Sequence, residues 1–415
     1  MTERQHTKVP IRLMWILLLA FSLRVGFSLV VFPSLVKHRG EELGWSENGR
    51  LLLDPYETIA RNVIAGNGYI DESGRYNYER LPLYTYFLVA VIHGLGNRSW
   101  ALPVVHGILE TASCLLIFLI AIQIHGRERP ALWAAILYAV YFKMIAMVPR
   151  PFTEPLTVFL LLFFLYLYHR DSGQPSMGFF TGILLGMITL IKPVILLFPL
   201  IYVAARKLDK KKTHPGNLLF FVLGFALIVA PIILHNQMRT GKIFLASGGG
   251  KMLYMGTVIE YGRDFRQNEQ KLMGDIGREF PFQYDIEVDN HLRELALKNI
   301  LQDPLAYLAR IGARILYFWA YPDFSTPLMA GKTLLVVIFN AVLLVLAVVG
   351  FYLARGQRFR IAMILAFFFY LYGIHAVIYA YSRYSLPLFP ILFIFSAFTV
   401  SRWRDQRCRA VAGSG

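Results

Sequence analysis

Charged residues are scarce in this sequence. Only 16% of its 415 residues are Asp, Glu, Lys or Arg, whereas about a quarter of an average soluble domain is charged. Hydrophobic residues make up 56%, and long apolar runs recur from Leu13 to Val400. Such runs suit bilayer-crossing helices, and they lack the apolar–polar alternation of a transmembrane barrel. The scarcity excludes an ordinary soluble domain and predicts an all-α polytopic membrane protein.

Cysteine is rarer still, with two residues in the whole chain. Cys114 lies inside an apolar run and Cys408 in a basic stretch, so no disulfide framework is indicated. The ten histidines are scattered without the spacing of metal ligands, and we expect His375, in a late apolar run, to be a packed polar contact. A repeat of fixed period is also lacking. These absences predict no cofactor and no dedicated metal centre.

Acidic residues are outnumbered, 26 against 42 Lys and Arg. The basic residues gather in short loops between apolar runs, which is the positive-inside bias of a cytoplasmic face. We therefore attribute the excess to topology and expect no nucleic-acid partner. The clusters are Arg127 with Arg129, 206–212, 355–360 and 402–409.

The apolar runs predict about ten transmembrane helices with both termini in the cytoplasm. The first, about 11–33, is too long for a signal peptide and lacks an A-x-A cleavage site. An external loop at 34–99 is expected to carry interfacial helices at about 52–65 and 82–96. The later spans are predicted at about 101–125, 131–147, 155–169, 178–191, 193–205, 217–234, 333–354, 359–380 and 385–401.

This topology divides the chain into three parts. Residues 1–234 would form a transmembrane catalytic module, 235–332 one larger external segment, and 333–415 the last helices with a basic cytoplasmic tail. The end of the external segment is amphipathic, and we expect its helix to break at Asp303-Pro304.

Carboxylates lie at the predicted outer membrane edge. Asp54 and Glu57 are three residues apart in Asp54-Pro55-Tyr56-Glu57, so they share a face if the segment is helical. The motif suits a helix start with Asp as N-cap and Pro in the first position. It also suits a base that takes a proton from an acceptor hydroxyl. Glu154 lies at the outer end of a span, where an ionisable group is costly and commonly functional.

Three cations fall on the same side, at Arg80, Lys192 and Arg383. They could snorkel to the membrane surface. Alternatively they could hold an anionic lipid headgroup and stabilise the charge that develops on a phosphate leaving group. The run 247–251 (Ser-Gly-Gly-Gly-Lys) is not a P-loop, because Leu245 and Met252 stand where that motif needs Gly and Ser or Thr. We expect a flexible turn there.

The order and spacing of these features resemble the membrane glycosyltransferases of the C-type fold that use polyprenyl-phosphate sugars. The resemblance is greatest to the family of protein O-mannosyltransferases and the lipid A aminoarabinose transferase, over about 10–240 and more loosely 330–400. This sequence departs from the family pattern in three places. Pro55 and Tyr56 separate two acids that are commonly adjacent, Leu81 replaces the first Pro of a Pro-Pro pair, and Glu154 stands where Asp is frequent. The matching residues are Asp54, Tyr56, Glu57, Ala60, Gly66, Gly68-Tyr69, Arg80-Leu81-Pro82-Leu83-Tyr84, Thr153-Glu154, Gly182, Gly186, 190–193, Arg383-Tyr384 and Pro387.

The resemblance implies a single inverting displacement, in which an acceptor hydroxyl replaces the lipid phosphate at the sugar's anomeric carbon. A divalent metal held by the acids stays open as an alternative. The roles implied are catalysis by Asp54, Glu57 and Glu154, with Asp54 as base; phosphate binding by Arg80, Lys192 and Arg383; and substrate binding by Tyr56, Tyr84 and Tyr384.

Other functions share the same features. A flippase or transporter of lipid-linked sugars also needs many spans and intramembrane charges, although it commonly has two related halves. A ligase of lipid-linked glycans would use a large late external loop. The expected partners are a polyprenyl-phosphate sugar, a lipid, glycan or protein hydroxyl acceptor, and the bilayer. The expected location is a bacterial inner membrane, with the active site facing the periplasm or exterior.

Overall fold

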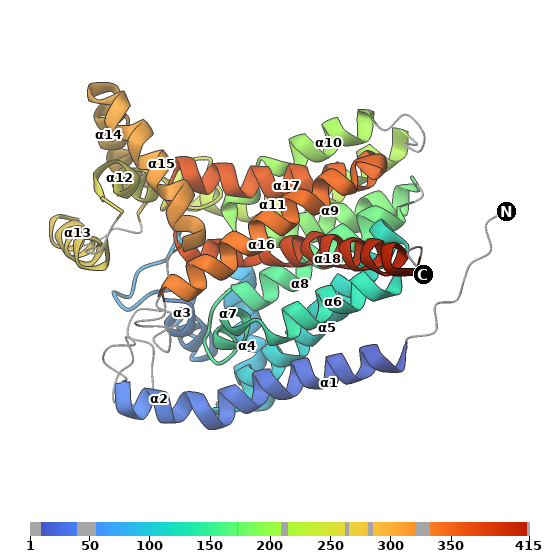
Figure 1. Cartoon of the computed structure of the whole chain (residues 1–415). Coiled ribbons are helices and arrows are strands. Elements are labelled where there is room, and N and C mark those ends of the chain that lie inside the picture. The colour runs from blue at the N-terminus through green and yellow to red at the C-terminus, as the bar shows by residue number, and fades with distance from the viewer. Residues whose placement is uncertain are drawn as a thin grey trace.

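The computed structural model describes residues 10–39, 55–171, 173–208, 215–261, 265–280, 285–320 and 333–412. Within these ranges the chain is almost entirely helical, and the β pairing there is one isolated bridge between Ile70 and Tyr76. Most of the long helices lie side by side in one bundle (Figure 1). The all-α prediction is confirmed.

The described residues form a long series of helices. The α-helices are α1 Ile11–Gly26, α2 Phe32–Arg39, α3 Pro55–Ile64, α4 Pro82–Leu95, α5 Ala101–His125, α6 Glu128–Val140, α7 Phe142–Met147, α8 Glu154–Arg170, α9 Pro175–Thr189, α10 Phe198–Leu208, α11 Pro215–Thr240, α12 Gly249–Val258, α13 Phe265–Glu279, α14 Ile286–Gln302, α15 Pro304–Ala320, α16 Thr333–Leu353, α17 Arg358–Val377 and α18 Phe389–Ala412. A π-helical stretch, Phe27–Val31, joins α1 to α2, and short 3₁₀ helices include η3 Pro193–Ile195 and η6 Ser382–Leu388.

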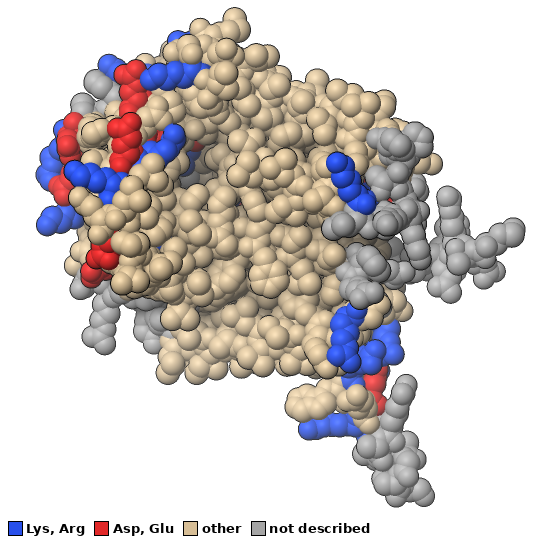
Figure 2. Space-filling view, turned by 90° about the horizontal axis from the view of Figure 1, so that it is seen from above, with Lys and Arg blue, Asp and Glu red and all other residues tan. Residues whose placement is uncertain are grey.

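Several helices are built to cross a bilayer. Among the described residues, five are long and apolar enough by length and composition: Ile11–His38, Ala101–His125, Gly216–Thr240, Leu334–Leu353 and Ser382–Cys408. Shorter apolar helices lie among them. Figure 2 shows a broad middle band without charged side chains, with Lys, Arg, Asp and Glu gathered towards its two ends. This is the surface of a multi-pass membrane protein.

The span predicted at about 131–147 is two helices rather than one. Tyr141 adopts an extended backbone, with φ −68° and ψ 110°, and separates α6 from α7. Apolar composition is the same on both sides of this residue, so the hydropathy pattern does not reveal the break. The break turns the chain at the end of α6 towards the segment that precedes Glu154.

Helices α9 and α11 approach each other through glycines. A Cβ added at Gly182 would collide with the carbonyl oxygen of Phe221, and one at Gly224 with that of Phe179. Small residues let two backbones come together where apolar side chains gain nothing over lipid. This contact fixes the position of the chain that follows α9, which carries Lys192.

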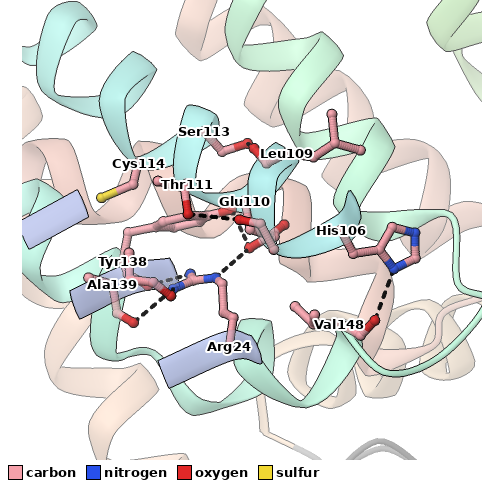
Figure 3. A network of polar contacts seen from close by, with 12 residues as sticks. Arg24, His106, Leu109, Glu110, Thr111, Ser113, Cys114, Tyr138, Ala139 and Val148 are labelled. Atoms are coloured by element: carbon pink, nitrogen blue, oxygen red, sulfur yellow. Dashed lines mark hydrogen bonds and ion pairs between the residues drawn. The ribbon is translucent and has the colours of Figure 1, made fainter. Parts of the chain in front are cut away.

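A buried polar network joins α1, α5 and α6 (Figure 3). Arg24 Nε lies 3.3 Å from Glu110 Oε2, and the Tyr138 hydroxyl donates to the same oxygen at 2.8 Å. The guanidinium also donates to the carbonyl oxygens of Tyr138 (3.0 Å) and Ala139 (2.9 Å). Arg24 is fully buried, and charges in an apolar interior require such partners. The network therefore holds α1 against α5 and α6.

A second, smaller core lies at one end of the bundle. Met255, Phe265, Leu292 and Tyr317 pack with Tyr379, so α12, α13, α14 and α15 share apolar contacts with the segment after α17. Figure 1 shows α12–α14 gathered at the left, opposite the end at which α1 begins and α18 finishes. As predicted, Asp303 separates α14 from α15.

Candidate active site

A cavity of about 220 Å³ opens where α3, α8, α12 and η6 meet. Its walls come from parts of the chain that are far apart in sequence: residues 55–56, 79–80, 151–154, 191–194, 247–249 with Met252, and positions between 375 and 384. The predicted residues Tyr56, Arg80, Glu154, Lys192, Arg383 and Tyr384 all line it. We refer to it as the central pocket.

Glu154 and Lys192 form an ion pair in its wall. Glu154 is the first residue of α8 and is almost fully buried, and its Oε1 lies 3.0 Å from Lys192 Nζ. Lys192 follows α9, and its ammonium lies 5.0 Å from the centre of the Tyr384 ring. Burial lowers the Lys192 pKa, Glu154 opposes that effect, and the net pKa lies below the usual lysine range. The ion pair holds the Lys192 ammonium in place beside the face of the Tyr384 ring.

Arg383 lies in η6 and contacts the segment that precedes α8. Its guanidinium carbon is 5.0 Å from the ring centres of both Phe152 and Tyr381, which hold the planar group by cation–π contact. The neighbouring Ser382 hydroxyl accepts a hydrogen bond of 3.0 Å from buried Lys143 of α7. The short helix is thereby tied to the bundle, and Arg383 is presented to the pocket from a rigid element.

Arg80 enters the pocket from the segment between α3 and α4. Its Nη1 lies 3.3 Å from Glu79 Oε1, and its guanidinium carbon is 5.3 Å from the Tyr56 ring centre. Tyr56 meets Tyr84 edge to face at 5.1 Å. Tyr84 is fully buried and lies outside the residues that line the pocket. Tyr84 therefore packs against Tyr56 without lining the pocket itself.

The predicted acids are distributed differently. Glu154 lines the pocket, whereas Glu57 lies outside its lining and pairs with Arg61 at 2.6 Å on α3. Asp54 lies outside the described residues. The two residues that follow it, Pro55 and Tyr56, both line the pocket. The catalytic role of Asp54 therefore stays a prediction.

Glu79 and the start of α12 are pocket residues that the sequence analysis missed. Ser247, Gly248 and Gly249 line the wall, and Gly249 begins α12. The expectation of a flexible turn at 247–251 is wrong, because Lys251 lies in the first turn of this helix and is buried. Glu79 is adjacent to Arg80, and this was the signal available in the sequence.

His375 both packs and lines the pocket. Its ring stacks on Tyr384 with centres 4.5 Å apart and contacts Phe318 on its other side. Among the residues that the structure describes, no three His, Cys, Asp or Glu side chains converge as a metal site. Glu79 and Glu154 are each paired with a lysine, so neither presents a bare carboxylate to a cation.

The helical membrane fold is that of the C-type glycosyltransferases. It matches the oligosaccharyltransferase AglB of Archaeoglobus fulgidus in complex with an inhibitory peptide and a dolichol-phosphate, with a TM-score of 0.54 at 13% identity over 98% of this chain and 51% of that one. The apo form matches with a TM-score of 0.56 at 15% identity, covering 99% and 53%. The chain thus spans about half the length of these proteins.

The sequence itself carries a family signal. Residues 80–235 match the family model described as dolichyl-phosphate-mannose-protein mannosyltransferase. The resemblance to membrane glycosyltransferases is confirmed by this match, which includes Arg80, Glu154 and Lys192. ArnT from Cupriavidus metallidurans bound to undecaprenyl phosphate is a weaker structural match, with a TM-score of 0.36 at 13% identity over 84% and 73% of the two chains. No curated protein sequence matches this chain.

Proposed function

We propose that the protein transfers a sugar from a polyprenyl-phosphate donor to a hydroxyl group of a lipid, glycan or protein acceptor. The observation that carries the proposal is the convergence of Arg80, Lys192 and Arg383 on one pocket. Three cations in a partly enclosed site suit a phosphate far better than a neutral sugar. The family model matched by residues 80–235 is named for a lipid-phosphate sugar donor, which supports the same substrate class.

The reaction balances without an external reagent. The acceptor oxygen bonds to the anomeric carbon while the bond from that carbon to the phosphate oxygen breaks, and its electron pair leaves with the lipid phosphate. Because a phosphate leaves as an anion, the cations can replace the acid that an inverting hydrolase needs. Arg80, Lys192 and Arg383 would together stabilise the leaving phosphate.

The acceptor proton requires a base, and we assign it to Asp54. Pro55 and Tyr56 bring the chain into the pocket wall immediately after this residue. Glu154 would orient the acceptor or the sugar, since its charge is already balanced by Lys192. Tyr56 and Tyr384 would contact the substrate through their rings, whereas Tyr84 would act through Tyr56.

The pocket lies at the α12–α14 end of the bundle, and the end of α18, where Asp405 pairs with Arg127, lies towards the other (Figure 1). By the positive-inside bias we place the pocket at the external face of a bacterial inner membrane, with both termini in the cytoplasm.

The test uses purified protein in detergent and a panel of polyprenyl-phosphate sugars, following release of free polyprenyl phosphate. We expect release by wild type and a loss of about 100-fold or more in Asp54→Asn, in line with general-base catalysis. Asp275→Asn is the matched control, because Asp275 is an acid on α13 that pairs with Arg278 at the surface. We expect full activity in excess chelator, since Glu79 and Glu154 are each paired with a lysine.

Three outcomes would change the proposal. Release that Asp54→Asn leaves unchanged would move the base to Glu57 or Glu154. Loss in chelator would indicate a metal held by the acids. No release with any donor, even with membrane extract supplied as acceptor, would overturn the transferase.

A further inference from the structure

The backbone that carries Glu79 and Arg80 is held by side chains within its own loop. The Asn77 side-chain oxygen accepts from the backbone N–H groups of Glu79 (3.0 Å) and Arg80 (2.8 Å). The Tyr69 hydroxyl donates to the Arg80 carbonyl oxygen at 2.8 Å. The loop is thus a compact unit. Leu81, directly after Arg80, packs with Leu190, Val229 and Leu245, and a further element contacts the loop through its backbone.

That element is the segment leading into α12. The Ser247 N–H donates to the Tyr78 carbonyl oxygen at 3.0 Å, which joins the two segments along their backbones. Gly248 follows with φ +94°, and a Cβ there would lie 2.8 Å from Glu79 Cγ. Glycine is required at this position both for its backbone conformation and for the approach of Glu79.

Glu79 and Lys251 close this contact with a buried ion pair. Lys251 Nζ bonds Glu79 Oε2, and the two side chains are 1% and 6% exposed. Burial would raise the Glu79 pKa, but Lys251 and Arg80 outweigh it and hold the pKa below its usual range. The Lys251 N–H donates to Asp289 Oδ1 at 3.0 Å, so the lysine also reaches α14.

The ion pair also limits how strongly the negative charge of Glu79 acts on Arg80. Glu79 presents one oxygen to Lys251 and the other, at 3.3 Å, to Arg80. Without Lys251 the full negative charge of Glu79 would fall on Arg80, which would then be less able to bind an anion.

We propose that Glu79 and Lys251 are positioning residues that clamp the Arg80 segment to the external helices α12 and α14 and keep Arg80 available to the phosphate of the donor. The proposal rests on the proposed function for its substrate. The clamp itself is a property of the fold and can be measured without turnover.

The experiment compares full-length wild type, Lys251→Met, Glu79→Gln, the double variant and Lys251→Arg. One readout is hydrogen–deuterium exchange in peptides covering 76–80 and 249–258, and the other is the Kd for a short-chain polyprenyl phosphate. The control is Lys242→Met, since Lys242 forms an exposed pair with Glu287 of α14. We expect faster exchange in both segments and a Kd raised about tenfold in each single variant, with the control at wild-type values.

The double variant and the arginine variant separate a clamp from general destabilisation. We expect the double variant to bind no worse than the weaker single variant, because the buried charge that loses this ion pair in each single variant is removed. Lys251→Arg keeps a cation and should restore most of the affinity. Unchanged exchange in either single variant, or single effects that multiply in the double variant, would overturn the clamp.

Failure of the proposed function has a different signature. If wild type binds no polyprenyl phosphate, the substrate is wrong, and exchange alone then decides the clamp. Faster exchange in both single variants would support it, and unchanged exchange would overturn it.

Discussion

Lys192 carries its charge where a lysine is easily neutralised. Its side chain is 18% exposed, and it lies between Glu154, which favours the ammonium, and Arg383, which disfavours it. Burial is the largest influence on its pKa and shifts it down. Because only the protonated form can bind phosphate, the same burial that strengthens the interaction narrows the pH range over which it operates.

This position predicts an alkaline limit to activity. The folded pKa lies below the usual lysine value, so the ammonium is lost as pH rises through the lowered pKa. In Lys192→Arg the guanidinium stays charged, and we expect the alkaline limb of kcat/KM to move up by about one pH unit or more. The profile is measured with a polyprenyl-phosphate sugar from about pH 7 to 11.

The control is Lys242→Arg, which changes an exposed lysine and should leave the profile as in wild type. If Lys192→Arg does not turn over, the same shift is read from binding of a polyprenyl phosphate. If the alkaline limb stays at the same pH in both measurements, it belongs to a group other than Lys192.

For single residues, part of the site can be predicted from the sequence. Arg80, Lys192 and Arg383 each interrupt or border an apolar run, so their cost in lipid marks them. Glu79 gives no such signal, because it lies in a polar loop and acquires its environment from Lys251, 172 residues away. Pairings of that range are set by tertiary structure and cannot be obtained from local pattern.

Among the elements, α9 and α11 illustrate how the site is supported from outside it. Their glycine contacts bring the backbone of α9 against α11, and Lys192 follows directly at the end of α9. The N–H of Lys192 still donates to the Ile188 carbonyl oxygen at 2.8 Å, so the lysine continues from the helix it follows. The packing of two apolar helices thereby sets the position of a charged group.

Gly182→Ala tests this contact. The added methyl group would meet the Phe221 carbonyl oxygen, and neither backbone can give way easily, so we expect a loss of about 1–3 kcal/mol in stability. The matched control is Gly373→Ala in α17, where an added Cβ has nothing within 4 Å. That change should be neutral or slightly stabilising, because alanine favours helix.

Thermal unfolding of both variants in one detergent, at one scan rate, measures the difference. Equal Tm values for the two variants would mean that α9 and α11 separate without cost, contrary to the structure.

Element boundaries could be predicted where composition changes and not where it is constant. The span at 101–125 has the bounds of α5, and Asp303-Pro304 separates α14 from α15 as expected. The break at Tyr141 and the pairing of Arg24 with Glu110 were not predicted, because both depend on what neighbouring helices present. An arginine inside α1 is a signal, but its partner lies 86 residues away.

For the whole molecule, the two ends of the bundle differ in what they carry. One end holds α12, α13 and α14 and the central pocket, and the other holds the end of α18 (Figure 1). Near that second end Asp405 of α18 pairs at 2.9 Å with Arg127, which precedes α6, and the positive-inside bias predicts a cytoplasmic location for this end. The orientation of the pocket therefore follows from the location of the α18 end.

The two native cysteines allow that orientation to be tested directly. Cys408 is exposed near the end of α18, and Cys114 is buried in α5 and should not react. In intact cells we expect a membrane-impermeant maleimide to leave the protein unlabelled, and to label Cys408 once the membrane is permeabilised. The complementary variant is Asp275→Cys in a Cys408→Ser background, since Asp275 is 44% exposed on α13 at the pocket end. It should be labelled in intact cells, because an external pocket requires an external α13. Labelling of Cys408 in intact cells, with Asp275→Cys protected, would reverse the topology and place the pocket on the cytoplasmic face, where the donor and acceptor would have to be sought instead.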